Sequence, residues 1–109
     1  MTETEKQRSA SRAKILKAMG HPSRIFILEK LSRKPHCVCE LAEMIGSDVS
    51  TVSKHLLVLK NAGLVDDEKD GTLVRYSLRC ECIMNFIGCV ETVIQTNLKR
   101  DMALLKGRR

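Results

Sequence analysis

Apolar residues recur three and four positions apart along most of this chain, the spacing that places them on one face of an α-helix. A first helix is expected over residues 5–19, where Gly20 ends it, and a second over residues 22–33, where Pro35 breaks the pattern. Residues 36–38 form a short, β-compatible segment. The first third of the chain is therefore predicted to be two helices followed by one short strand.

The central stretch, residues 37–65, predicts two short helices joined by a tight turn. The first covers residues 39–45, and Gly46 supplies the left-handed residue that commonly follows a helix. Asp48 then stands where a helix N-cap is favoured, and the second helix is expected over residues 49–62. Its apolar positions fall on one stripe, which we expect to be buried: Val52, Leu56, Leu59 and Ala62.

The opposite face of this second helix is polar and is expected to be exposed. Small hydroxyl groups at its start, followed by a cation, are chemistry suited to base edges and phosphates in the major groove of DNA. An ordinary solvated face is the alternative that these residues alone leave open. The polar positions are Ser50, Thr51, Ser53, Lys54, His55 and Lys60.

A β-hairpin is predicted directly after this pair of helices. Two strand-like segments, residues 64–68 and 72–78, flank Asp70-Gly71, the strongest type of short hairpin signal. The first strand is acidic, and its carboxylates are expected to be solvated. Two cations flank the tip at positions suited to a phosphate backbone: Lys69 and Arg75.

Residues 83–106 predict a long helix with an apolar stripe that is about six turns long. Nothing left in a domain of this size could cover such a stripe. We therefore expect a dimerisation helix, packed together with the helix over residues 5–19 against a twofold mate. The stripe consists of Ile83, Ile87, Val90, Ile94, Leu98, Met102 and Leu105.

Length and charge narrow the class of protein. A chain of 109 residues is expected to form one small domain, here mainly α with a small β-hairpin (α+β). The net charge of +6, from 19 Lys and Arg against 13 Asp and Glu, favours a polyanionic partner. Nucleic acid fits better than a membrane surface, because no helix is basic on one side and rich in Trp or Phe on the other.

The chain is expected to be cytoplasmic. It has no run of 18 apolar residues that would span a membrane, and its N-terminus lacks the apolar segment of a secretory signal. Five cysteines are many for such a chain, and in a reducing compartment clustered cysteines indicate metal or redox chemistry more often than structural disulfides.

The predicted order of elements and four sequence segments together resemble the ArsR/SmtB family of bacterial and archaeal metal-responsive repressors. The segments are HPSRIFILEKL, CVCEL, VSTVSKHLLVLKNAGLV and DGTLVRYSL, and the resemblance covers about residues 13–80. It implies a single winged helix-turn-helix domain over residues 1–109 that dimerises through its N- and C-terminal helices. The helix-turn-helix maps onto about residues 39–62 and the wing onto about residues 64–78.

The resemblance also implies a function. Members of this family bind a palindromic operator in double-stranded DNA as homodimers and release it when a ligand binds. The DNA-contact role of the recognition helix would fall on Ser50, Thr51, Ser53, Lys54 and His55, and that of the wing on Lys69 to Arg75. No membrane, no organic cofactor and no enzymatic activity are expected.

The arsenic-sensing branch of the family carries a C-x-C pair at the head of the first helix of the helix-turn-helix, which here is Cys37 and Cys39. Thiolates are soft ligands that favour thiophilic ions such as As(III), Sb(III), Cd, Pb and Zn. As(III) prefers three sulfur ligands. The position that often supplies the third sulfur in the family is Ala42 here. The cadmium-sensing branch uses cysteines of the N-terminal arm, and the zinc/nickel branch uses histidines of the last helix. This sequence has neither set of residues.

Cys80 or Cys82 is our hypothesis for the missing sulfur. In winged helices the short strand pairs antiparallel with the second wing strand. We expect this pairing to place residues 36–38 beside residues 76–78, with Cys80 and Cys82 just past the strand end, near Cys37. The predicted effector is therefore As(III) or another thiophilic ion bound by these four cysteines.

Other interpretations of the cysteines stay open. Paired thiols of low pKa could form a disulfide or polysulfide, which would make the protein a redox or reactive-sulfur sensor of the same fold. Cys89 lies near the apolar stripe of the last helix, and we expect it to be packed as a small apolar residue. A small thiol enzyme is disfavoured, because the chain offers no set of acid and base partners.

Overall fold

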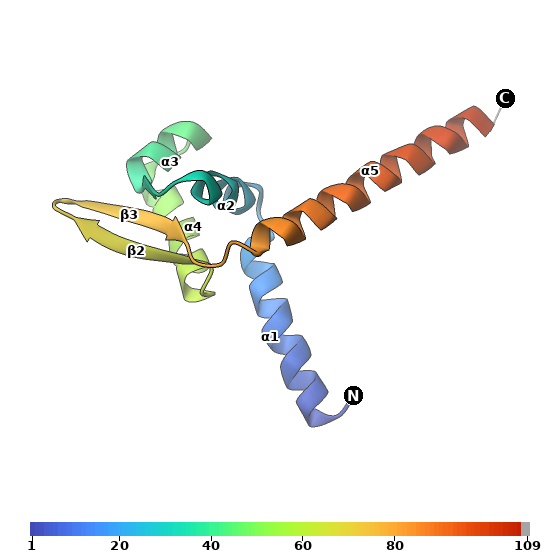
Figure 1. The fold of residues 1–109 in the computed structure, drawn as a ribbon, viewed down its shortest axis with the longest axis horizontal. Helices are drawn as coiled ribbons and strands as arrows, with labels where there is room; N and C mark the ends of the chain where they lie inside the picture. Colours follow the sequence, from blue (N-terminus) through green and yellow to red (C-terminus); the bar gives the residue numbers. More distant parts are fainter. Residues whose placement is uncertain (108–109) are drawn as a thin grey trace.

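The computed structural model describes residues 1–107, which form five helices and one three-stranded sheet (Figure 1). The observed fold is the mainly α arrangement with a β-hairpin that the sequence predicts. In chain order the elements are α1 (Glu3–Met19), α2 (Pro22–Arg33), β1 (His36–Cys37), α3 (Val38–Ile45), α4 (Val49–Asn61), β2 (Val65–Asp70), β3 (Leu73–Leu78) and α5 (Ile83–Gly107).

The hydrophobic core lies where α2, α3 and α4 meet the base of the sheet. Its centre is aliphatic, and each fully buried side chain of this kind stabilises the fold by about 1.5–3 kcal/mol. From α1 the C-terminal end reaches the core, through the buried Ala18 and Met19 and the partly buried Ile15. The side chains with almost no exposed surface are Ile27, Leu28, Leu41, Val52, Leu56, Leu59 and Val65.

The turn between α3 and α4 is fixed by the two residues that the sequence singles out. Gly46 follows α3 with a φ of 78°, the left-handed conformation that glycine adopts without strain. Asp48 is the N-cap of α4, and its Oδ1 accepts a hydrogen bond of 2.8 Å from the backbone N–H of Thr51. This hydrogen bond lowers the pKa of the Asp48 carboxyl. The start of α4 is thereby set relative to α3.

The sheet has the strand order β1-β3-β2, with both pairs antiparallel. The hairpin reverses at Gly71, whose φ of 66° only glycine adopts freely. The strand bounds differ slightly from those expected. β2 runs from Val65 to Asp70, where residues 64–68 were expected, and β1 ends at Cys37. Val38 already belongs to α3, so the short strand is one residue shorter than expected.

Two long helices extend away from the compact part of the chain, α1 in one direction and α5 in another (Figure 1). The radius of gyration is 17.6 Å, whereas a compact chain of this length would have about 13 Å. None of the residues of α5 is buried. Among the described residues, no helix is long and apolar enough to cross a membrane.

Candidate nucleic-acid interface and cysteine sites

The outer face of α4 is exposed and mostly polar, although Leu57, which is 56% exposed, also lies on it. Ser50, Thr51, Ser53 and Lys54 all face solvent. On the other side of the helix the expected stripe is buried except for Ala62, which follows the last helical residue and is half-buried. The amphipathic pattern explains this division, since the stripe packs into the core. Four of the residues proposed to contact DNA are therefore free to meet a ligand surface.

His55 lies differently from the position that we assigned to it. Its side chain is only half-exposed and turns toward α2, where its ring lies 4.4 Å from the ring of His21, measured between centroids. The Arg24 side chain donates a hydrogen bond from Nε to His55 Nδ1 at 3.2 Å. His55 is therefore held between two helices and is not presented freely on the outer face of α4.

Arg24 connects three helices, a role that helical periodicity could not reveal. Besides binding His55 of α4, its Nη1 donates to the backbone carbonyls of Ala18, at 3.2 Å, and Lys17, at 3.5 Å, in the last turn of α1. A cation at the C-terminal end of a helix is stabilising. Arg24 thus links α1, which extends from the domain, to α4, which carries the polar outer face.

Protonation of His55 is disfavoured in the folded chain. Burial of the ring lowers its pKa most, and the neighbouring His21 and Arg24 lower it further. We expect the imidazole resonances of His55 to titrate below the ordinary histidine value of about 6.5. A pKa at or above that value would contradict the observed packing. In Arg24→Gln the pKa should rise, because one nearby positive charge is removed.

The sign of the pH dependence follows from this shift. Because the pKa of His55 is lowered in the folded state, its contribution to stability is fully present above the unfolded value of about 6.5. That contribution is lost as the pH falls through the folded pKa. A urea unfolding series between pH 7.5 and pH 5 measures the loss, which should be smaller in His55→Gln.

Lys60 and Arg75 are partly neutralised by carboxylates of strand β2. Lys60 Nζ binds Asp67 Oδ2 at 2.9 Å, and this hydrogen bond raises the pKa of Lys60. At the hairpin tip, Arg75 Nε binds Asp70 Oδ2 at 3.2 Å. Lys69 is exposed beside them. DNA phosphates would therefore compete with carboxylates for Lys60 and Arg75.

Cys37 is buried and hydrogen-bonded at the start of α3. Its backbone N–H and its Sγ both donate to Glu40 Oε1, at 3.3 and 3.2 Å, while His36 Nδ1 lies 3.0 Å from Glu40 Oε2. These hydrogen bonds, that of His36 first, lower the pKa of Glu40 to about 2. Cys39, in contrast, is exposed. The first C-x-C pair is thus one buried thiol and one accessible thiol.

The strand register separates the two C-x-C pairs. Cys37 lies opposite Arg75, and His36 lies opposite Tyr76, so the chain beyond Tyr76 runs toward Pro35 and away from Cys37. A hollow of about 230 Å³ confirms this direction, since Ser77, Leu78 and Glu81 line it together with residues 31–35. The expectation that Cys80 and Cys82 lie near Cys37 within one chain is therefore wrong.

No metal site is assembled within the single chain. Among residues 1–107, no three His, Cys, Asp or Glu side chains come together in a way that could hold a metal ion. The described residues bring no three sulfurs together, so a single chain can offer As(III) at most two sulfurs at one place. The four cysteines that the sequence suggests as ligands form two separate pairs.

Cys80 and Cys82 lie in the connection between β3 and α5, and their sulfurs are 2.8 Å apart. Both are exposed. Their contact lowers the pKa of Cys80, whose thiolate accepts a hydrogen bond from Cys82, and raises the pKa of Cys82. Cys89 is exposed as well, and 100° per residue places it opposite the apolar stripe of α5. Within one chain Cys89 is not packed, contrary to expectation.

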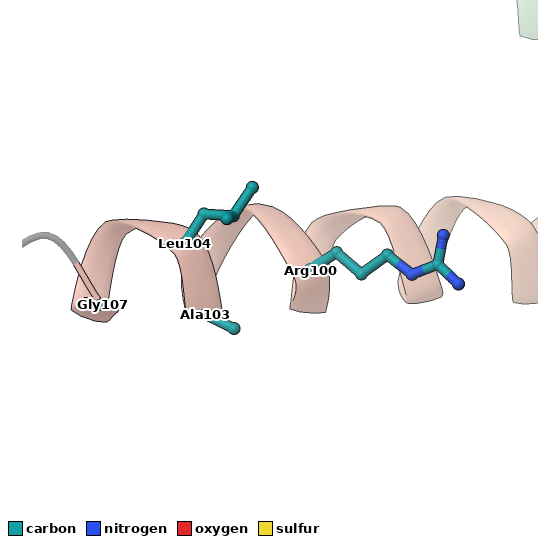
Figure 2. Close-up of a pocket in the computed structure, with 4 residues that line it drawn as sticks. All are labelled: Arg100, Ala103, Leu104 and Gly107. Carbon is teal, nitrogen blue, oxygen red and sulfur yellow. The ribbon is translucent and has the colours of Figure 1, made fainter.

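The apolar stripe of α5 is open to solvent in the single chain. Near α1 and α2 it borders a groove of about 290 Å³, which Leu16, Met19, Phe86 and Ile94 help to line. Farther along, Leu98 is 59% exposed. Figure 2 shows Arg100, Ala103 and Leu104 projecting from the last turns of α5, and no other described element packs on them. Such a length of exposed apolar helix marks an interaction surface.

These features define a winged helix-turn-helix DNA-binding regulator, in which α3 and α4 form the helix-turn-helix and β2 and β3 form the wing. Residues 21–67 match the family described as "Bacterial regulatory protein, arsR family". The chain belongs to this family of transcriptional regulators, and the relatives below place it there rather than among enzymes.

Two curated relatives and one solved structure show the extent of the similarity. The chain is 36% identical over 96 residues to the HTH-type transcriptional regulator YgaV of Escherichia coli, covering 85% of this chain and 97% of YgaV. It is 39% identical over 83 residues to a cadmium resistance transcriptional regulatory protein, a CadC homologue of Staphylococcus aureus, covering 75% of this chain and 69% of that protein.

The solved structure is that of Mb0332 from Mycobacterium bovis, described as a homodimeric winged helix-turn-helix DNA-binding domain of a possible ArsR-family regulator. It superimposes with a TM-score of 0.78 at 25% identity, covering 92% of this chain and 93% of that one. The similarity therefore extends beyond the helix-turn-helix to the long terminal helices.

Proposed function

We propose that the protein is a cytoplasmic homodimeric repressor that binds a palindromic operator and releases it when a thiophilic ion, As(III) above all, binds its cysteine thiolates. The observation that carries the DNA-binding part is the exposed, mostly polar face of α4 opposite the buried side chains of Val52, Leu56 and Leu59. A helix with its polar face exposed in this way can enter the major groove.

The proposed DNA contacts divide between the recognition helix and the wing. Ser50, Thr51, Ser53 and Lys54 face outward and are assigned the direct contacts. His55 is kept as a residue that positions α4 through Arg24, and it can reach DNA only if that hydrogen bond opens. Secondary contacts with phosphates are assigned to three cations: Lys60, Lys69 and Arg75.

The homodimer is proposed to form through α1 and α5. The exposed apolar stripe of α5 needs a cover, and the solved relative Mb0332 is described as homodimeric. A twofold dimer would place two α4 helices about 34–36 Å apart, which is one helical turn of DNA. An isologous interface along α5 would thereby set the spacing of the two recognition helices.

The effector is proposed from chemistry and from a relative. Two C-x-C pairs supply soft thiolate ligands, and the Staphylococcus aureus relative is named for cadmium resistance. As(III), Sb(III), Cd, Pb and Zn are the candidate ions. A coupling free energy of about 1–3 kcal/mol between the ion and the operator is typical of such linkage.

Replacing Lys54 tests the assignment of the recognition helix. We expect Lys54→Ala to weaken operator binding by about 5–150-fold, a loss of about 1–3 kcal/mol. The slope of log affinity against log salt should fall by up to about 2, since the dimer loses two positive charges at the DNA surface. Fluorescence anisotropy with a labelled operator measures both quantities.

The matched control for this experiment is Lys99→Ala, which removes one exposed cation from α5, on the side away from its apolar stripe. Its operator affinity and salt slope should stay within error of those of the parent. Equal effects of the two substitutions would mean that Lys54 acts only through net charge and that α4 is not the reading element.

A redox or reactive-sulfur sensor of the same fold is the second candidate. The observation that favours it is the contact of 2.8 Å between the exposed sulfurs of Cys80 and Cys82. Peroxide could oxidise the two thiols to a disulfide, with two molecules of water as the other product. Operator release by peroxide or a persulfide donor without any metal would favour this function.

A further inference from the structure

The connection between the wing and α5 holds two thiols side by side. The backbone N–H of Arg79 donates to the carbonyl of Leu64 at 3.0 Å, which anchors the connection to the start of the wing. On the other side, Ile83 N–H donates to the Cys80 carbonyl at 3.3 Å, and Asn85 N–H donates to the Cys82 carbonyl at 3.1 Å. The turn that carries both sulfurs is therefore fixed at both ends.

We propose that Cys80 and Cys82 form a self-contained two-sulfur site for trivalent arsenic or antimony, independent of Cys37 and Cys39. This inference rests on the proposed function, since it names which of the cysteines form the first binding unit. It differs from the four-cysteine hypothesis because the strand register carries Cys80 and Cys82 away from Cys37. The sulfurs of Cys80 and Cys82, in contrast, are in contact with each other.

The chemistry of the site balances without any oxidant. Arsenous acid carries three hydroxyl groups, and two of them leave as water as two thiols form As–S bonds. The two thiol protons leave in those waters, and arsenic stays trivalent. The third hydroxyl remains on arsenic, because no third cysteine lies near the pair within the described chain.

The spacing of the sulfurs favours an angular ion over a linear one. Two sulfurs on a tetrahedral ion with bonds of about 2.3 Å lie about 3.8 Å apart, and on a linear ion about 4.6 Å apart. A pyramidal centre has a narrower sulfur–ion–sulfur angle than either of these ions. Binding it would therefore require the smallest increase in the present sulfur–sulfur distance of 2.8 Å. Zinc is disfavoured for another reason, since it prefers four protein ligands in a structural site.

The exposure and chemistry of the pair also suit a thiophilic ion. Cysteine sulfur is a soft ligand that favours such ions. Because both side chains are exposed, the ion can reach them without any local unfolding.

The position of the pair gives it a regulatory consequence. The residues between β3 and α5 join the wing directly to the helix with the exposed apolar stripe. Chelation would fix the side chains on this short connection and so bias the direction in which α5 leaves the sheet. An ion bound there would act on the dimer interface and the wing together.

The test uses full-length reduced protein and two triple variants. One, Cys37→Ser/Cys39→Ser/Cys89→Ser, keeps only Cys80 and Cys82, and the other, Cys80→Ser/Cys82→Ser/Cys89→Ser, keeps only the first pair. Sodium arsenite is the probe. The readouts are the near-ultraviolet absorbance of As–S bonds and the number of thiols that still react with a chromogenic disulfide reagent.

We expect the variant that keeps Cys80 and Cys82 to bind one arsenic per chain and to lose both reactive thiols. Adding Cys80→Ser to it should weaken binding by at least about 100-fold. The inference is overturned if the triple variant that keeps Cys80 and Cys82 has the far-ultraviolet circular dichroism of the parent but still has two reactive thiols at arsenite concentrations that saturate the parent.

Failure of this inference can be told apart from failure of the proposed function. If the parent releases its operator with arsenite while the variant binds none, the two-sulfur site is wrong and the repressor function stands. If the variant binds one arsenic but the parent holds its operator at saturating arsenite, the site stands and the proposed effector is wrong.

Discussion

The variant Ile94→Glu/Leu98→Glu is expected to be monomeric and to bind the operator at least about 100-fold more weakly than the parent. Both side chains are more than half exposed in the single chain and lie on the apolar stripe of α5. A carboxylate at a closed apolar interface would have to be desolvated without a partner, which is costly. Sedimentation equilibrium measures the oligomeric state, and anisotropy measures the affinity.

Thr96→Glu is the matched control for the dimer interface, because Thr96 is exposed on the face of α5 opposite the stripe. It adds one carboxylate to the same helix, where the double variant adds two, and should stay dimeric. A dimeric Ile94→Glu/Leu98→Glu protein with unchanged operator affinity would show that α5 does not form the interface.

The second large effect is expected from the core of the helix-turn-helix. Leu56 of α4 has no exposed surface, so Leu56→Ala should lower the free energy of unfolding by about 2–5 kcal/mol through lost apolar contacts and a residual cavity. For a domain of this size that is a large share of the total stability. Urea unfolding followed by circular dichroism, at one fixed protein concentration, measures the difference.

The neighbouring residue provides the comparison. Leu57 is 56% exposed on the same helix, and Leu57→Ala should change the free energy of unfolding by no more than about 0.5 kcal/mol. The two substitutions delete the same atoms at successive positions. Equal losses of stability would contradict the orientation of α4 and with it the assignment of its outer face.

The sequence predicted the fold because its signals are local and repeated. Spacing of apolar residues located all five helices, and Gly46, Asp48 and Gly71 marked the turns through conformational and capping preferences that act within a few residues. The long stripe of α5 predicted a helix that one chain leaves uncovered, and every residue of that helix is at least partly exposed. These features need no knowledge of distant contacts.

The candidate site was predicted less completely because it depends on contacts between elements. By periodicity His55 falls beside the buried stripe, three residues after Val52 and four before Leu59, so its half-buried place on α4 could have been read from the sequence. Its hydrogen bond with Arg24, 31 residues earlier, could not. The antiparallel pairing of β1 with β3 agrees with expectation. However, the chain after Tyr76 runs away from Cys37, whereas we expected it to run toward Cys37. That error alone placed Cys80 beside Cys37, whereas the register carries it the other way.

The most direct test of the central proposal is an operator-release titration of the reduced dimer followed by fluorescence anisotropy. As(III), Cd(II), Zn(II) and a polysulfide donor are added separately to the same labelled complex. A thiolate-dependent repressor should release the operator with As(III) at the lowest concentration, and the release should reverse on adding excess dithiol. Retention of the operator at saturating As(III), with release only by the sulfur donor, would contradict the proposal.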